Sequence, residues 1–277
     1  MTKIDAHHHF WRYDPVEYSW ISEDMSAIRR SFEPADLSVE LKGAGLDGVV
    51  SVQARQSIEE TWQLLTYADQ NDFIRGVVGW VPLTSPDLNR TLATVATHPK
   101  LRAVRHVLQD EPDPLYILRE DFNRGVASLH PFHLAYDILI FERHLPQTIQ
   151  FVDRHPNQVF VVDHLAKPRV KDGLISPWRE NLRKLAERPN VYCKISGLAT
   201  EADHQHWTED QLRPYMEVVL EAFTPRRVMF GSDWPVCLVA VRYGEWVKIV
   251  ERTVGRLSAP EQERIWSGTA REAYKLS

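Results

Sequence analysis

Three histidines and one aspartate stand at the ends of apolar, strand-like segments of this 277-residue chain. His7 and His9 end the first such segment. His164 ends the sixth, and Asp233 follows the eighth. Side chains two positions apart on a strand point to the same side, so His7 and His9 can clamp one metal ion or one oxyanion. One such residue alone is more often structural or a helix N-cap. The four together indicate a catalytic centre.

Eight short apolar segments recur along the chain and must position these four side chains. Most are near-continuous apolar runs rather than alternating ones, which suits strands buried on both faces of a parallel sheet. The expected strands are Lys3–His9, Gly48–Gln53, Ile74–Val81, Leu101–Val107, His133–Ile140, Gln158–Asp163, Val191–Ile195 and Arg227–Phe230.

Helical patterns lie between the apolar segments, and several begin with capping signals. Capping-box patterns occur at residues 57–60, 208–211 and 258–261. Ser85-Pro86 and Ser176-Pro177 each place an N-cap serine before a first-turn proline. A last helix is expected near Glu261–Lys275.

The eightfold alternation of strand and helix predicts a single-domain (β/α)₈ barrel, a TIM barrel, over residues 1–277. An open doubly wound sheet is the alternative. It needs a glycine-rich phosphate loop after the first strand, where this chain has His-His-His-Phe-Trp. Residues 12–33 carry few helix signals and are expected to form a long first loop that covers the site.

The composition suits a globular enzyme, because 43% hydrophobic and 26% charged residues supply a large core and a polar surface. The net charge is −5 and basic residues form no block, which argues against nucleic-acid or membrane partners. Without a transmembrane-length run or a signal peptide, a cytoplasmic location is expected. Cys193 and Cys237 are expected to be reduced thiols. No pattern addresses the oligomeric state.

Catalytic groups of barrels project from the carboxyl ends of the strands, so other polar side chains there are also candidates for the site. Asp163 directly precedes His164 on the sixth strand. The further candidates are Gln53, Trp80, Arg105, His106, Tyr136 and Lys194.

The ordered set of motifs resembles the amidohydrolase-2 branch of the amidohydrolase superfamily. The motifs are His7-x-His9, Asp163-His164 and Gly231-Ser232-Asp233-Trp234-Pro235. More narrowly, residues 4–11 and 232–238 resemble sugar lactonases of the L-fuconolactonase and L-rhamnonolactonase type. The correspondence runs nearly end to end, from Ile4 to Tyr274.

This resemblance implies roles for the candidate residues. Asp233 is expected to be the general base that takes a proton from water. His7, His9 and His164 are expected to polarise the scissile carbonyl, either directly or through one divalent ion. Arg105 is expected to anchor the substrate. The remaining substrate contacts are expected from His106, Gln53, Trp80, Tyr136 and Lys194.

The metal content expected from the resemblance is at most one ion. Many members of the superfamily hold two metals bridged by a modified lysine on the fourth strand, but this strand ends in Arg105-His106. Zinc suits three imidazoles and Asp233 as ligands, with a position left open for water. Some lactonases of this branch work without a metal, and the sequence leaves both alternatives open.

The expected reaction is the hydrolysis of a sugar (aldono) lactone to the sugar acid, a step of carbohydrate catabolism. One alternative is a metal-dependent decarboxylase of the same branch. Another is a hydrolase of a carboxylated lactone, since Arg105 fits a carboxylate. A barrel that only binds a sugar acid or a partner protein is a third, and the intact set of three histidines and Asp233 argues against it. The sequence does not identify the sugar.

Overall fold

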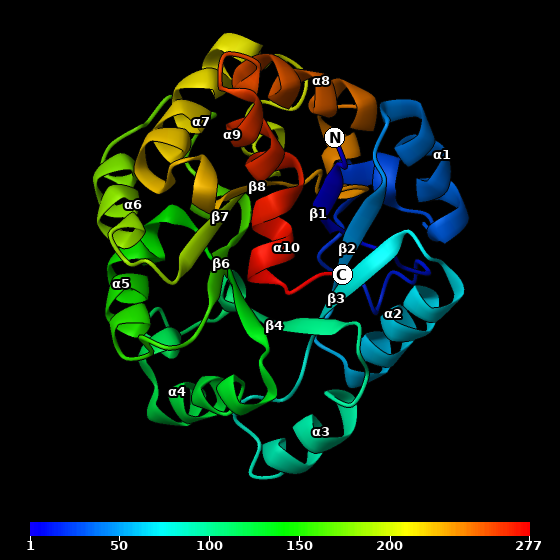
Figure 1. Ribbon diagram of the computed structural model, residues 1–277, viewed down its shortest axis with the longest axis vertical. Helices are drawn as coiled ribbons and strands as arrows, with labels where there is room; N and C mark the ends of the chain where they lie inside the picture. The colour runs from blue at the N-terminus through cyan, green and yellow to red at the C-terminus, as the bar shows by residue number, and fades with distance from the viewer.

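The computed structural model describes residues 1–277, and its eight parallel strands form a nearly closed barrel ringed by helices (Figure 1). The strands pair in chain order, β1 to β8. Each lies within one of the eight predicted segments, so the predicted (β/α)₈ barrel is confirmed. The strands are β1 (Ile4–His8), β2 (Gly48–Val52), β3 (Ile74–Gly79), β4 (Leu101–Val107), β5 (Ala135–Leu139), β6 (Phe160–Val162), β7 (Val191–Ile195) and β8 (Val228–Phe230).

The barrel closes through residues that lie just beyond β1 and β8. The backbone N–H of His9 donates to the carbonyl of Trp234 (2.7 Å), and that of Asp233 donates to the carbonyl of His7 (2.8 Å). Ser232 adds a side-chain link, since its Oγ donates to Asp5 Oδ2 (2.6 Å). The two predicted motif segments therefore form the seam of the barrel.

Helices follow the strands around the outside of the barrel (Figure 1). Capping boxes at Thr208 and Ser258 and the Ser57 N-cap are present as predicted. The helices are α1 (Pro34–Ala44), α2 (Ile58–Gln70), α3 (Leu88–Val95), α4 (Glu120–Ala127), α5 (Leu145–Asp153), α6 (Trp178–Ala186), α7 (Glu209–Phe223), α8 (Tyr243–Val254), α9 (Ala259–Glu263) and α10 (Thr269–Ala273).

Three helix boundaries differ from the prediction. Helix α3 begins at Leu88, because residues 82–85 form a turn in which the N–H of Ser85 donates to the carbonyl of Pro82 (2.9 Å). Helix α6 begins after Pro177, and the hydroxyl of Ser176 donates to Glu180 instead of capping the helix. The expected last helix is divided into α9, a π-helical turn and α10.

The core has two parts, one on each side of the barrel wall. The larger lies between the strands and the surrounding helices. The smaller fills the barrel interior, where Ala6, Val50 and Val52 pack with Ala273 and Tyr274 of the C-terminal segment. Helix α10 thus covers the amino-terminal end of the barrel (Figure 1), which leaves the carboxyl-terminal end for a site.

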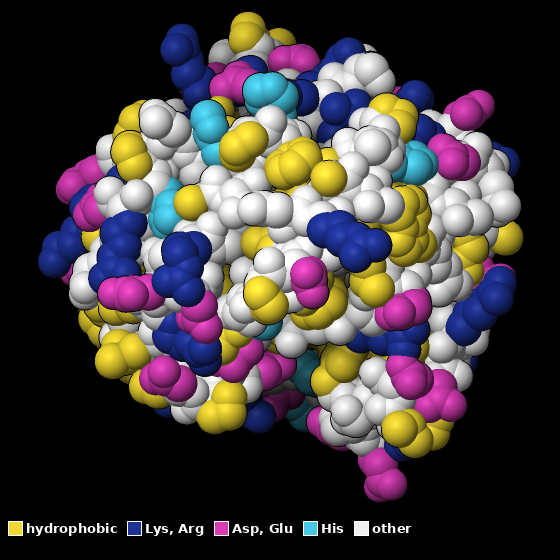
Figure 2. Space-filling model, turned by 90° about the horizontal axis from the view of Figure 1, so that it is seen from below, with side chains coloured by type: hydrophobic (Ala, Val, Ile, Leu, Met, Phe, Trp, Pro, Cys, Tyr) yellow, Lys and Arg dark blue, Asp and Glu magenta, His cyan; other side chains and the backbone are white.

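The surface carries interspersed basic and acidic side chains on the face shown in Figure 2. None of the helices has the combination of length and apolarity needed to span a membrane. Cys193 and Cys237 are free and buried, as predicted.

Candidate active site

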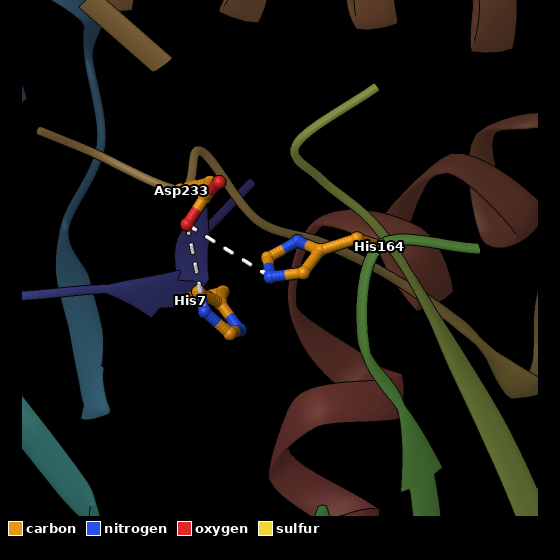
Figure 3. A group of neighbouring side chains, drawn as sticks. All are labelled: His7, His164 and Asp233. Carbon is orange, nitrogen blue, oxygen red and sulfur yellow. Dashed lines mark ion pairs between the residues drawn. The ribbon is translucent and has the colours of Figure 1, made fainter. Parts of the chain in front are cut away.

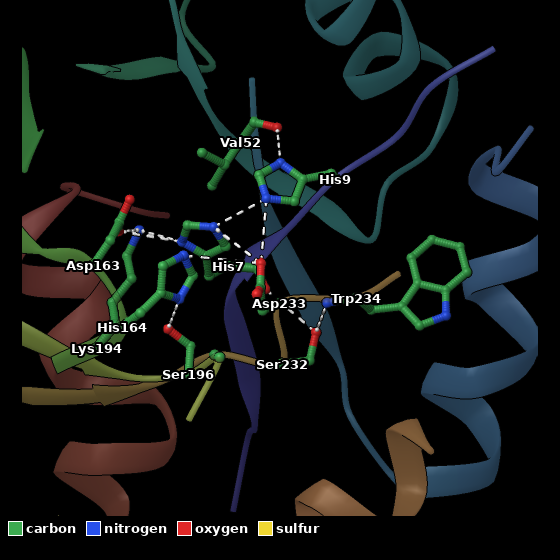
Figure 4. Close-up of polar contacts among 12 residues, drawn as sticks. His7, His9, Val52, Asp163, His164, Lys194, Ser196, Ser232, Asp233 and Trp234 are labelled. Carbon is green, nitrogen blue, oxygen red and sulfur yellow. Dashed lines mark hydrogen bonds and ion pairs between the residues drawn. The ribbon is translucent and has the colours of Figure 1, made fainter. Parts of the chain in front are cut away.

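His7, His164 and Asp233 meet at the carboxyl-terminal end of the barrel (Figure 3), and His9 lies beside them (Figure 4). Asp233 Oδ1 lies 3.3 Å from His9 Nε2, 3.7 Å from His7 Nε2 and 3.9 Å from His164 Nε2. The Nε2 atoms of His7 and His9 are 3.2 Å apart. One carboxylate oxygen is therefore surrounded by three imidazoles that come from β1 and from the end of β6.

Each imidazole is oriented through its other ring nitrogen (Figure 4). His9 Nδ1 lies 2.8 Å from the carbonyl of Val52, which only accepts, so Nδ1 donates and Nε2 faces the centre. His164 Nδ1 lies 2.8 Å from Ser196 Oγ. His7 Nδ1 lies 3.2 Å from Asp163 Oδ1. Such outer partners fix ring orientation in metal and catalytic sites.

Burial sets the charge of the centre. It lowers the pKa of His7 well below its ordinary value, and it lowers the pKa of His164 to about 4. Burial also raises the pKa of Asp233, but His164 and His9 outweigh that effect and the pKa ends below its ordinary value. At neutral pH the centre therefore presents an ionised carboxylate and neutral His7 and His164 imidazoles.

These residues fit one divalent cation. The donor atoms of His7, His164 and Asp233 all lie within 4.8 Å of one another. His9 Nε2 is directed at the same carboxylate oxygen. Neutral imidazoles and a carboxylate are ligands that zinc prefers. The structure holds a single group of this kind.

A left-handed turn directly after β6 places His164 at the mouth of the barrel. His164, Leu165, Ala166 and Lys167 have φ angles of 51°, 55°, 58° and 47°. This region is unfavourable for residues other than glycine, so the surrounding structure must hold the turn. Trp178 does so in part, since its Nε1 donates to the carbonyl of Leu165 (2.7 Å). The turn also brings Lys167 into the cavity, a residue that the sequence analysis missed.

Gly197 lies against the centre in a conformation that disfavours a side chain, with a φ of +59°. A Cβ there would lie 2.7 Å from His164 Nδ1 and 3.0 Å from Asp233 Oδ2. We expect Gly197→Ala to lower kcat/KM for the reaction at this centre by about 100-fold, because small displacements of reacting groups have effects of that size. Steady-state kinetics on the folded variant would measure it.

Gly173→Ala is the matched control for this substitution. Gly173 has a similar φ of +66°, but a Cβ there would meet nothing within 4 Å. Both variants therefore carry the same backbone strain, and only Gly197→Ala disturbs the centre. Equal activity of the two variants would contradict the role assigned to the space beside His164.

A buried network of charges links the centre to the far end of the barrel. Asp163 accepts from Arg105 Nη1 (2.9 Å) and lies 2.9 Å from Lys194 Nζ. Lys194 Nζ also donates to Asp137 (2.6 Å), and Asp137 accepts from the hydroxyl of Tyr274 (2.8 Å). Opposite charges alternate along the network, so each is paired within the barrel interior. Asp163 thus braces the barrel and also faces the ring of His7.

A cavity of about 360 Å³ opens in front of the centre and is lined in part by His9, His164 and Asp233. Trp20 also lines it, so segment 12–33, which includes a short 3-10 helix at Glu23–Ile28, contributes to the cavity wall. Of the six predicted substrate contacts, only Arg105 is among the lining residues. Its guanidinium also donates to Asp163 and to the carbonyl of Gln53.

Tyr136 is one of the predicted contacts that the structure places elsewhere. Side chains alternate across a strand, and at this point of β5 Asp137 faces inward while Tyr136 faces the helices. The prediction that Tyr136 contacts substrate is therefore wrong. Its ring is fully buried among other aromatic rings, those of Phe122, Phe151 and Phe160.

The other four predicted contacts also lie outside the cavity lining. The amide of Gln53 is buried and faces the carbonyl of Arg105 at 3.4 Å. Lys194 Nζ lies 3.1 Å from His7 Nδ1, in the charge network. The backbone N–H of Trp80 donates to the hydroxyl of Thr61 in α2. His106 Nε2 lies 2.6 Å from the carboxylate of Glu111. For these four residues, direct contact with a substrate stays a prediction.

The residues that line the cavity in their place come from loops beyond the strands, where no periodic pattern exists to reveal them. They are Arg55, Gln56, Gln109, Asp110, Glu111 and Lys167. The short spacing of these residues from β2, β4 and β6 is the one sequence signal that could have found them.

The centre lies at the carboxyl-terminal end of the strands, where TIM-barrel enzymes have their active sites. A family model described as Amidohydrolase matches residues 4–276, and the chain belongs to this family. The resemblance predicted from the motifs is therefore confirmed.

Proteins of known name align with the chain over nearly its whole length. An L-fucono-1,5-lactonase from Burkholderia multivorans is 41% identical, with 99% of this chain and 96% of that protein covered. A second L-fucono-1,5-lactonase, from Burkholderia ambifaria, is 36% identical with the same coverage. A crystal structure of an amidohydrolase from Burkholderia multivorans with bound zinc is 41% identical, covers 100% of both chains and has a TM-score of 0.97.

Proposed function

We propose that this protein hydrolyses a sugar lactone to the open sugar acid. The observation that carries the proposal is the meeting of three imidazoles and Asp233 beside a cavity. The chain that builds this centre aligns end to end with L-fucono-1,5-lactonases.

In the proposed reaction Asp233 is the general base. Its Oδ1 faces the imidazoles, which leaves Oδ2 to take a proton from water. The oxygen of that water forms a bond to the lactone carbonyl carbon, and the ring C–O bond then breaks. The proton passes from Asp233 to the departing ring oxygen, so that a carboxylic acid and a hydroxyl result.

The three histidines are assigned to the carbonyl oxygen. A divalent ion held by His7, His9, His164 and Asp233 would supply Lewis-acid polarisation there when bound. Val52, Ser196 and Asp163 hold the three rings in place.

The charges of the cavity favour a neutral, hydroxylated substrate over a carboxylated one. Two carboxylates besides that of Asp233 line it, those of Asp110 and Glu111. Each cation that lines it already has a carboxylate partner; the pairs are Arg105–Asp163, Lys167–Glu201 and Arg55–Glu17. A carboxylated lactone, or the aromatic acid of a decarboxylase, would need a cation free to bind its carboxylate.

A panel of D- and L-aldonolactones tests the proposal, with L-fucono-1,5-lactone among the first. Proton release is followed with a pH indicator, with and without a chelator, and after zinc is added back. We expect at least one sugar lactone to be opened well above its spontaneous rate, with activity lost to the chelator and restored by zinc. If no sugar lactone is opened, the proposal fails, and release of carbon dioxide from an aromatic acid would identify a decarboxylase.

The pH profile should show an acid limb near pH 4. The pKa of His164 is lowered to about 4 by burial, and that of Asp233 is also lowered. His164 therefore stays neutral and Asp233 stays ionised down to about that pH. Below it, His164 gains a proton and loses its lone pair, and Asp233 ceases to be a base. We expect kcat/KM to be level between pH 7 and about 5, with the product measured by chromatography. An acid limb near 6.5 would show that the imidazoles titrate as they do in water.

A further inference from the structure

Glu111 is a cavity residue whose position is set by a histidine. It follows β4 by a short turn, and its side chain is 19% exposed where it lines the cavity. His106 Nε2 lies 2.6 Å from Glu111 Oε1. An ionised carboxylate only accepts, so His106 is the donor. Glu111 Oε2 has no hydrogen bond within the protein and remains available.

The histidine is itself rigidly held. The ring of His106 stacks on that of Tyr116, with an angle of 6° and 5.2 Å between centroids. The ring of Phe122 meets it edge-on at 5.6 Å. Since His106 is 7% exposed and lies outside the cavity lining, it acts on the cavity only through Glu111.

Two glutamines extend the polar wall on which Glu111 lies. Gln56 Oε1 accepts from the backbone N–H of Val107 (2.9 Å), which leaves the amide hydrogens of Gln56 unused. Gln109 Oε1 is buried and has no partner in the structure. Both residues line the cavity. The wall therefore offers acceptors and donors side by side, which matches hydroxyl groups because each hydroxyl both donates and accepts.

We propose that Glu111 is a specificity-determining residue that accepts hydrogen bonds from ring hydroxyls of the substrate, with His106 as its positioning residue. This inference rests on the proposed lactone hydrolysis and adds the surface that recognises the sugar. A ring without hydroxyls would leave Glu111 Oε2 without a partner in the cavity, which is how polar sites reject substrates that lack a partner group.

The test compares the turnover of two lactones by the protein, L-fucono-1,5-lactone and the unsubstituted δ-valerolactone. Glu111→Gln removes the charge but keeps the shape. We expect kcat/KM for the hydroxylated lactone to fall about 10- to 100-fold, as for the loss of a hydrogen bond to a charged group. For δ-valerolactone we expect a change of less than about threefold.

A second variant tests the positioning role and serves if Glu111→Gln does not fold. His106→Phe keeps a ring against Tyr116 but removes the donor to Glu111. It should lower the ratio of kcat/KM for L-fucono-1,5-lactone to kcat/KM for δ-valerolactone, by a smaller factor than Glu111→Gln does. Glu120→Gln, which alters an exposed carboxylate on α4, is the control and should leave the ratio unchanged.

The outcomes separate the two proposals. A loss confined to the hydroxylated lactone supports the role of Glu111. An equal loss on both lactones, or no loss, overturns that role while lactone hydrolysis stands. A wild-type protein that opens neither these lactones nor the aldonolactone panel overturns lactone hydrolysis, and the role of Glu111 with it.

Discussion

Replacement of Asp233 by asparagine is expected to lower kcat for lactone opening by about two to four orders of magnitude. The amide has nearly the same shape but cannot take the proton of the attacking water. The fold should persist, because the backbone bond from Asp233 to the carbonyl of His7 (2.8 Å) does not involve the side chain. Steady-state kinetics at neutral pH, with circular dichroism on the same sample, measures both.

The metal content of this variant must be measured alongside its rate. Asp233 Oδ1 lies among the three imidazoles, so the substitution could also weaken binding of an ion. A variant that retains its zinc but loses turnover identifies Asp233 as the base. A variant with a nearly unchanged rate would refute that assignment, whatever its metal content.

Replacement of Lys194 by methionine is expected to lower the free energy of unfolding by about 3–5 kcal/mol, the range found when one partner of a buried ion pair is removed. Lys194 is fully buried, and its ammonium lies 2.6 Å from Asp137 and 2.9 Å from Asp163. Without it, two carboxylates face each other inside the barrel. Urea denaturation followed by fluorescence measures the loss.

The loss should depend on pH in a defined direction. In the wild-type protein burial raises the pKa of Asp163, but Lys194 and His7 outweigh it and the pKa lies well below its ordinary value. Without Lys194 the pKa of Asp163 rises, so protonation at lower pH relieves the repulsion. We therefore expect a smaller deficit at pH 5 than at pH 8. Lys248→Met, on the exposed side of α8, is the control and should change stability by less than about 0.5 kcal/mol. A deficit that is the same at both pH values would contradict the electrostatic cause.

The strands could be predicted because each is buried on both faces. That burial favours a mainly apolar run, and the predicted segment Val191–Ile195 matches β7 residue for residue although it contains the buried Lys194. The start of α3 was less predictable. Ser85-Pro86 has the residues of a helix start, but the same pair also suits the turn that precedes Leu88, and local sequence does not separate the two.

The candidate site likewise contains residues that could be predicted from the sequence and residues that could not. His7 and His9 were recognisable because their spacing on a strand sends both side chains to one side. Asp137 was overlooked in favour of Tyr136, although alternation along β5 allows only one of the two to face inward. Lys167 reaches the cavity through four consecutive left-handed residues, a conformation that no propensity scale favours for non-glycine residues.

The seam of the barrel affects the order in which the protein folds during synthesis. Ser232 and Asp5, which join across it, are 227 positions apart, and His9 meets Trp234 beside them. During synthesis this edge of β1 stays unpaired until residues 232–234 have left the ribosome. Contacts so distant in sequence form late, after shorter loops have closed. Because His7, His9 and Asp233 of the candidate centre lie at this seam, the centre is assembled only after β1 and the segment that follows β8 have met.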